Sequence, residues 1–133
     1  GYDFQDMGAS SYDEQDDYPD FVKPVAEKVA VDPNAMGIIL GGSGQGEAIV
    51  ANRYNNVRAV VYYGGPEEMV RVTRLHNNAN VLSIGAAWGD TVSESTPLGE
   101  EQVKRAIKLW LETDFLSAPR HVRRIAKIEK TLS

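Results

Sequence analysis

Residues 36–47 read MGIILGGSGQGE, an apolar run that passes straight into a glycine-rich loop and then into a carboxylate. The run at 36–40 has the length of a strand that is covered on both faces, as strands of parallel sheets are. A loop is expected over 41–46, and a helix from Glu47 to Arg53. A strand that enters a helix through a glycine loop predicts the βα unit of an α/β protein.

The segments on either side of this unit continue to alternate between strand and helix. Short apolar or alternating runs predict strands, and amphipathic segments predict helices. The expected strands are Tyr2–Met7, Val57–Tyr63 and Val81–Gly85, and the expected helices are Pro19–Val31, Pro66–His76, Leu98–Glu112 and Arg120–Leu132. This order predicts an α/β fold: a three-layer, doubly wound (Rossmann-like) parallel sheet with helices on both faces.

The composition fits one globular domain over residues 1–133 and excludes several kinds of function. Of the 133 residues, 42% are hydrophobic and 25% are charged, which is ordinary for a packed domain. The formal net charge of −5 argues against a nucleic-acid-binding protein. No apolar run has the length of a membrane span. The chain has no cysteine, which excludes thiolate metal sites and a cysteine nucleophile. A cytoplasmic protein is expected.

Charge is divided between the two ends of the chain. The segment from Asp3 to Asp20 carries acidic residues and no Lys or Arg, and we expect its acidic run from Asp13 to Asp17 to form a solvated loop that binds no metal. The segment from Arg120 to Lys130 carries three Arg and two Lys. An acidic start and a basic end predict that anions are held near the C-terminal helix.

The glycine loop is suited to an anion, because backbone amides at a helix N-terminus point outward and the helix dipole favours negative charge. It lacks the Lys-Ser/Thr ending of a P-loop, and Gly42, Gly44 and Gly46 give G-x-G-x-G rather than the dinucleotide fingerprint. The glycines alone fit a turn that only packs strand against helix equally well. Glu47 fits a general base that faces a developing oxyanion, but also a first-turn Glu favoured by the dipole.

Four motifs carry a resemblance to a known family. They are IILGGSGQGEAIVANR at 38–53, DYPDF at 17–21, HNNANVL at 76–82 and RHVRR at 120–124. In this order and over nearly the whole chain they resemble the B-type ribose-5-phosphate isomerases. Many members have Cys at the place of Gly41, whereas others use a Glu that follows the loop. The chain is similar to the second type through Ser43 and Glu47.

The resemblance implies isomerisation of a phosphorylated aldose, most simply ribose 5-phosphate, to its ketose, with no metal or cofactor. Glu47 would carry a proton between C2 and C1 through an enediolate. The enediolate oxygens would be stabilised by the Ser43 hydroxyl and the amides of Gly42, Gly44 and Gly46. The resemblance leaves two alternatives open: isomerisation of a hexose phosphate, and a non-catalytic module that binds sugar phosphates.

The resemblance also implies roles for polar residues outside the loop. His76 would help to open the furanose ring, Asn77 would bind substrate hydroxyls, and Tyr18 would line the pocket. Arg120 and Arg124 lie four residues apart, so they share a helix face and can clamp a phosphate together.

Each of these residues has a simpler reading. His76 ends a helix, where a cation favours the dipole, and Tyr18 could only pack on the pocket. His121 fits a structural or a phosphate-binding role, and Arg123 fits a solvated basic face. Trp88 and Trp110 are expected in the core or at an interface.

Family members normally begin with a further strand and helix, whose connecting loop carries an Asp-His pair, and nothing in this chain matches that segment. We expect a preceding piece in the complete protein. The alternatives are a separate chain that supplies the segment, or a rearranged sheet covered by a partner. The resemblance also implies a homodimer or tetramer with sites at the subunit interface, where His76 and the arginines come from a different subunit than Glu47.

Overall fold

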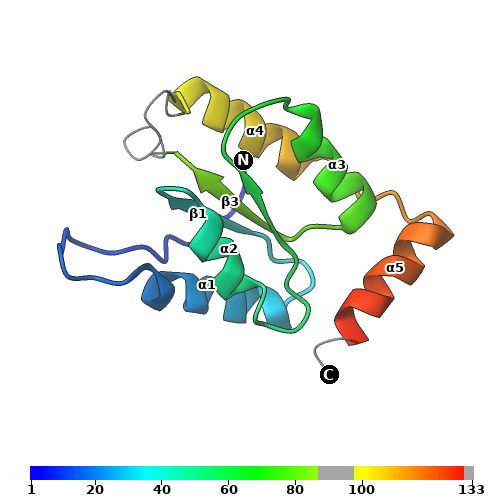
Figure 1. Ribbon diagram of the computed structural model, residues 1–133, viewed down its shortest axis with the longest axis horizontal. Coiled ribbons are helices and arrows are strands. Elements are labelled where there is room, and N and C mark those ends of the chain that lie inside the picture. The colour runs from blue at the N-terminus through cyan, green and yellow to red at the C-terminus, as the bar shows by residue number, and fades with distance from the viewer. Residues whose placement is uncertain (87–97, 131–133) are drawn as a thin grey trace.

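A computed structural model of the chain, which describes residues 1–86 and 98–130, has a parallel sheet between two layers of helices (Figure 1). The strands are β1 (Gly37–Gly41), β2 (Ala59–Tyr62) and β3 (Val81–Gly85), in the order β1-β3-β2. The helices are α1 (Tyr18–Val31), α2 (Gln45–Ala51), α3 (Glu68–Asn77), α4 (Glu100–Glu112) and α5 (Pro119–Lys130). The predicted three-layer α/β fold is therefore confirmed.

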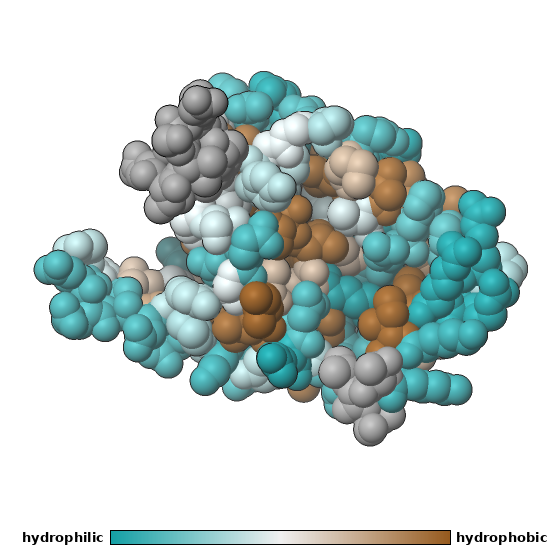
Figure 2. Space-filling model, viewed as in Figure 1, coloured by the Kyte–Doolittle hydropathy of each residue, from teal (hydrophilic) through white to brown (hydrophobic). Residues whose placement is uncertain are grey.

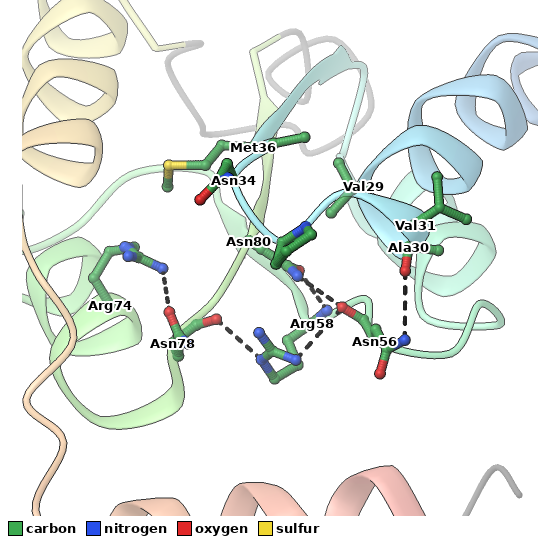
Figure 3. Close-up of a pocket in the computed structure, with 12 residues that line it drawn as sticks. Val29, Ala30, Val31, Asn34, Met36, Asn56, Arg58, Arg74, Asn78 and Asn80 are labelled. Carbon is green, nitrogen blue, oxygen red and sulfur yellow. Dashed lines mark hydrogen bonds between the residues drawn. The ribbon is translucent and has the colours of Figure 1, made fainter.

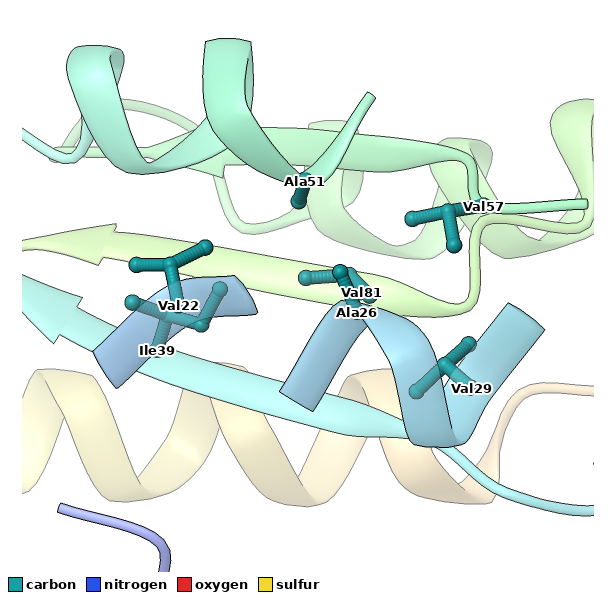
Figure 4. Packing of buried hydrophobic residues seen from close by; sticks show 7 residues of the cluster. All are labelled: Val22, Ala26, Val29, Ile39, Ala51, Val57 and Val81. Carbon is teal, nitrogen blue, oxygen red and sulfur yellow. The ribbon is translucent and has the colours of Figure 1, made fainter. Parts of the chain in front are cut away.

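The central strand β3 is buried at all five positions because both faces and both edges of it are covered. Val81 faces α1 and α2, where an apolar cluster fills the space between these helices and the sheet (Figure 4). Leu82 and Ile84 face α3 and α4 on the other side, and pack with Trp110, which is fully buried. The expectation of Trp110 in the core is confirmed, whereas Trp88 lies outside the described residues.

The strand predicted over Tyr2–Met7 is wrong, because these residues form no regular structure and pair with no strand. The side chains of Tyr2 and Phe4, which suggested the alternation, are 63% and 89% exposed. Alternation predicts a strand only where an edge accepts its backbone. The segment is instead tied to α1 by one hydrogen bond, which Lys28 donates to the Gln5 side chain.

Helix α1 begins one residue before the predicted Pro19. Asp17 takes the N-cap position, but its side chain makes no capping hydrogen bond. The other elements begin and end within two residues of their predicted limits, as is usual for element ends, except that the predicted end of the last helix at Leu132 lies outside the described residues.

Candidate active site

The glycine loop lies at the carboxyl edge of the sheet and is held there by β3. Gly44 has a left-handed backbone with φ of 74°, and a Cβ at this position would come within 3.0 Å of the Gly85 amide nitrogen. The buried Ser83 hydroxyl donates a hydrogen bond of 2.7 Å to the Gly44 carbonyl. The turn therefore needs glycine for its conformation and for its close approach to β3.

The loop presents hydrogen-bond donors that have no partner in the described part of the chain. The amides of Gly42, Gly44 and Gly46 make no hydrogen bond to any described residue. The exposed Ser43 hydroxyl accepts a hydrogen bond of 3.2 Å from the Gln45 amide, so its own proton remains available. Such a set of amides and one hydroxyl can stabilise an oxyanion.

Glu47, in the first turn of α2, places its carboxylate against the start of this loop. The residue is only 8% exposed, and its carboxylate makes no hydrogen bond or ion pair with any described residue. An added Cβ at Gly41 would come within 2.5 Å of the Glu47 Cδ, so the carboxyl group occupies the space beside this glycine. A largely buried carboxylate without a partner is a candidate general base.

Tyr18 belongs to the same group of residues. Its ring lies on Gly46, where an added Cβ would come within 2.7 Å of the Tyr18 Cζ, and its side chain remains about half exposed. The tyrosine therefore forms one wall beside the first turn of α2, next to Glu47.

His76 lies elsewhere, at the C-terminal end of α3, and stacks on His121 of α5. The two ring centroids are 4.4 Å apart with an angle of 18° between the planes. His121 is 3% exposed, and its Nε2 has no hydrogen-bond partner among the described residues. Burial lowers the pKa of His121, and the nearby His76, Arg120 and Arg124 lower it further. The pair therefore favours a neutral His121 that fixes the plane of the His76 ring.

Asn77 and the arginines belong to the same two helices as this histidine pair. Asn77 is the exposed last residue of α3, and Arg120 and Arg124 lie one turn apart on α5, both exposed. Their spacing lets two guanidinium groups reach one phosphate. Arg123 is also exposed, as expected for a solvated basic face.

The predicted site residues thus form two groups at opposite edges of the sheet. The strands are parallel, so α3 runs back from the carboxyl edge and ends where β3 begins. In Figure 1, β1 and β3 point to the left of the view, away from α5 at the right. The two groups lie at opposite ends of β3, and the four residue steps along this strand span about 13 Å. One chain therefore does not bring Glu47 and His76 to a common ligand.

Two contacts at this site were missed by the analysis of the sequence. In the sequence, Ser83 is simply one residue of a strand that is expected to be buried. The available signal was its hydroxyl, because a hydroxyl inside an apolar run requires a hydrogen-bond partner. The stacking of His121 on His76 joins residues 45 positions apart (121 − 76), and no local pattern announces it.

Neither a metal site nor a membrane span is found in the part of the chain that the structure describes. No group of three or more His, Asp or Glu side chains there is arranged to hold a metal ion. None of the described helices combines the length and the apolar content needed to cross a bilayer.

Comparisons with known proteins identify the family. The Ribose/Galactose Isomerase family profile matches residues 1–128. The ribose-5-phosphate isomerase B of Mycolicibacterium paratuberculosis is 38% identical over 129 residues, which cover 95% of this chain and 74% of that protein. The enzyme of the same name from Mycobacterium tuberculosis is 35% identical over 134 residues, which cover 98% of this chain and 76% of that protein.

Solved structures agree with this result. Ribose-5-phosphate isomerase B of Clostridium thermocellum matches with a TM-score of 0.83 and 32% identity, over 98% of this chain and 79% of that one. The Mycoplasma genitalium protein, solved with bound ribulose-5-phosphate, matches with a TM-score of 0.81 and 30% identity, over 94% and 75% of the two chains. The chain therefore belongs to the ribose/galactose isomerase family.

Proposed function

We propose that the protein interconverts ribose 5-phosphate and ribulose 5-phosphate, with Glu47 as the base. The observation that carries the proposal is the Glu47 carboxylate, which is 8% exposed, lacks a described partner and lies beside a loop of free amides. Family membership supplies the substrate class. A cytoplasmic location fits such a metabolic reaction and is part of the proposal.

In the proposed reaction, Glu47 removes the proton from C2 of the open-chain aldose. The electron pair forms the C1–C2 double bond, and negative charge moves to the carbonyl oxygen O1. The loop amides and the Ser43 hydroxyl donate to the enediolate oxygens. Glu47 then returns the proton to C1. The proton of the O2 hydroxyl moves to O1, and C2 becomes the carbonyl carbon.

The second group of residues supports ring opening and phosphate binding. His76, held against His121, can move a proton between the ring oxygen and the anomeric hydroxyl. Asn77 can hydrogen-bond the sugar hydroxyls, and Arg120 and Arg124 can bind the phosphate.

The separation of the two groups favours a homodimer whose sites combine both subunits. His76, Asn77, Arg120 and Arg124 of one subunit would then face the glycine loop of the other. Exposed apolar side chains on α5 support this arrangement, because Val122 and Ile128 remain 48% and 52% exposed in the single chain. In the view of Figure 2 the surface over α5 is mainly hydrophilic, which fits the phosphate-binding role of this helix.

The Glu47→Gln variant tests the base. It keeps the shape of the side chain but removes the basic oxygen, so ketose formation from ribose 5-phosphate should fall by about 10²–10⁴-fold. The affinity for ribose 5-phosphate should change little. An unchanged turnover number would remove Glu47 from the role of base. Equal turnover with a hexose phosphate would contradict the choice of substrate.

Mixed subunits test the composite site. Glu47→Gln and the double variant Arg120→Gln/Arg124→Gln should each be nearly inactive. A dimer of one subunit of each kind contains one intact site if the two groups come from different subunits. Activity should therefore return after subunit exchange, towards a quarter of the wild-type value in a statistical mixture. Absence of recovery, with exchange verified by mass, would place both groups in one subunit.

A further inference from the structure

A pocket lies at the amino edge of the sheet, opposite the glycine loop. Its volume is about 620 Å³, and it opens to solvent between the C-terminal ends of α1 and α3 (Figure 3). It is lined by Val29, Ala30, Val31, Pro33, Asn34, Ala35, Met36, Asn56, Arg58, Arg74, Asn78 and Asn80. None of these residues has a role in the proposed isomerisation.

The pocket carries positive charge that is only partly balanced. Two arginines line it and no carboxylate does. Arg58 forms an ion pair of 2.7 Å with Glu129 of α5, which lies outside the lining. Arg74 forms no ion pair with any described residue. Burial and the charge of Arg58 lower its pKa, and the charge of Asp114 opposes them only in part. An anion in the pocket would relieve this repulsion.

Each guanidinium group is fixed and still has an unused end. Nε of Arg58 donates to the Asn78 carbonyl at 3.0 Å, and Nε of Arg74 donates to the Thr113 carbonyl at 3.1 Å. The Nη1 atoms are also hydrogen-bonded, whereas neither Nη2 has a partner among the described residues. The donors are therefore held in place by the protein before a ligand arrives.

The remaining lining can bind an uncharged part of the same ligand. Asn80 is rigid, because its amide oxygen accepts from the Arg58 backbone at 2.7 Å and its nitrogen donates to the Asn56 carbonyl at 2.7 Å. The Asn34 side chain makes no described hydrogen bond, and it faces the two arginines across the opening (Figure 3). Val29 and Met36 add an apolar wall.

We propose that this pocket binds a small organic phosphate, independently of the sugar phosphate at the glycine loop. Guanidinium donors match phosphate oxygens in geometry and charge. The volume lies in the range of small-molecule sites and exceeds the need of a single inorganic ion. Asn78 follows His76 and Asn77 directly, so the ligand would contact the end of α3 that carries these two residues of the proposed active site.

The test is a titration of the ¹⁵N-labelled full chain with glycerol 3-phosphate, a phosphate ester that is not an aldose. The Nε–H signals of Arg58 and Arg74 and the side-chain signals of Asn34 and Asn80 should shift in a saturable manner. Asn34→Asp places a negative charge at the opening and should weaken this binding by about fivefold or more. The control Gln15→Glu makes the same charge change on the exposed acidic loop and should leave the affinity unchanged.

Asn34 holds no other residue through its side chain, so this variant should fold even where an Arg58 variant fails. Shifts confined to Arg120 and Arg124 would overturn the proposal, because the ester would then bind only the proposed active site. Equal affinities of the Asn34→Asp and Gln15→Glu variants would overturn it as well. Malonate that shifts the same pocket signals with the same affinity would refute the assignment to phosphate.

Discussion

Replacement of Gly41 by alanine tests whether the space beside this glycine holds the Glu47 carboxylate in place. The added Cβ would lie about 2.5 Å from the Glu47 Cδ. Two carbon atoms in contact prefer about 3.5 Å, so the carboxyl group must retreat by about 1 Å. A displacement of this size at a reacting group reduces the rate by about 10²-fold, or about 2.7 kcal/mol in the activation free energy.

The assay follows ketose formation from ribose 5-phosphate, together with the thermal midpoint of unfolding. We expect kcat to fall by about two orders of magnitude while the midpoint stays near the wild-type value, because the backbone at Gly41 is extended and accepts alanine. Gly99→Ala is the matched control: among the described residues its Cβ would meet only the Gln102 side chain, 4.0 Å away, so kcat should not change. A Gly41→Ala variant with kcat within threefold of wild type would refute the reasoning.

Three further predictions concern the stability of the fold around the site. Ser83→Ala leaves the Gly44 carbonyl without its buried donor, and should lower the free energy of unfolding by about 1–3 kcal/mol in urea titrations and also lower kcat. Gly37→Ala would bring a Cβ within 2.8 Å of Val25 Cγ1, so the same titrations should show a loss of about 1–3 kcal/mol, with kcat unchanged. Because the pKa of His121 is lowered from its usual 6.5, the unfolded chain binds a proton more readily, and stability should fall as the pH drops below about 6.5. His121→Asn should weaken that dependence between pH 7.5 and 5.5, and an equally steep dependence in the variant would contradict it.

One outcome each would contradict the predictions for Ser83→Ala and Gly37→Ala. Unchanged stability of Ser83→Ala would mean that water replaces the hydroxyl at Gly44. Reduced kcat in Gly37→Ala would mean that the amino end of β1 communicates with the loop at its carboxyl end.

Local patterns predicted most of the fold, because the amphipathic helices and the buried strand at 81–85 are determined by residues close in sequence. The same reasoning failed at Tyr2–Met7, where a strand requires a free sheet edge that the segment does not reach. The glycine loop was recognisable from its own residues, but its attachment to Ser83 was not, since 39 positions separate Ser83 from Gly44. Likewise, the division of the site residues between two edges follows from the direction of α3, which emerges only with the sheet order.

The structure also gives a physical reason for the link between residues 41 and 47. The carboxyl group of Glu47 fills the volume in which a side chain at position 41 would begin. A side chain at position 41 and a carboxylate reaching back from position 47 therefore compete for one space next to the loop amides. A cysteine in place of Gly41 would have its thiol start from this same point. Such a thiol and the carboxylate of Glu47, the proposed base, are thus steric alternatives at one position of the fold, and a Gly41→Cys variant would have to displace Glu47 before its thiolate could act.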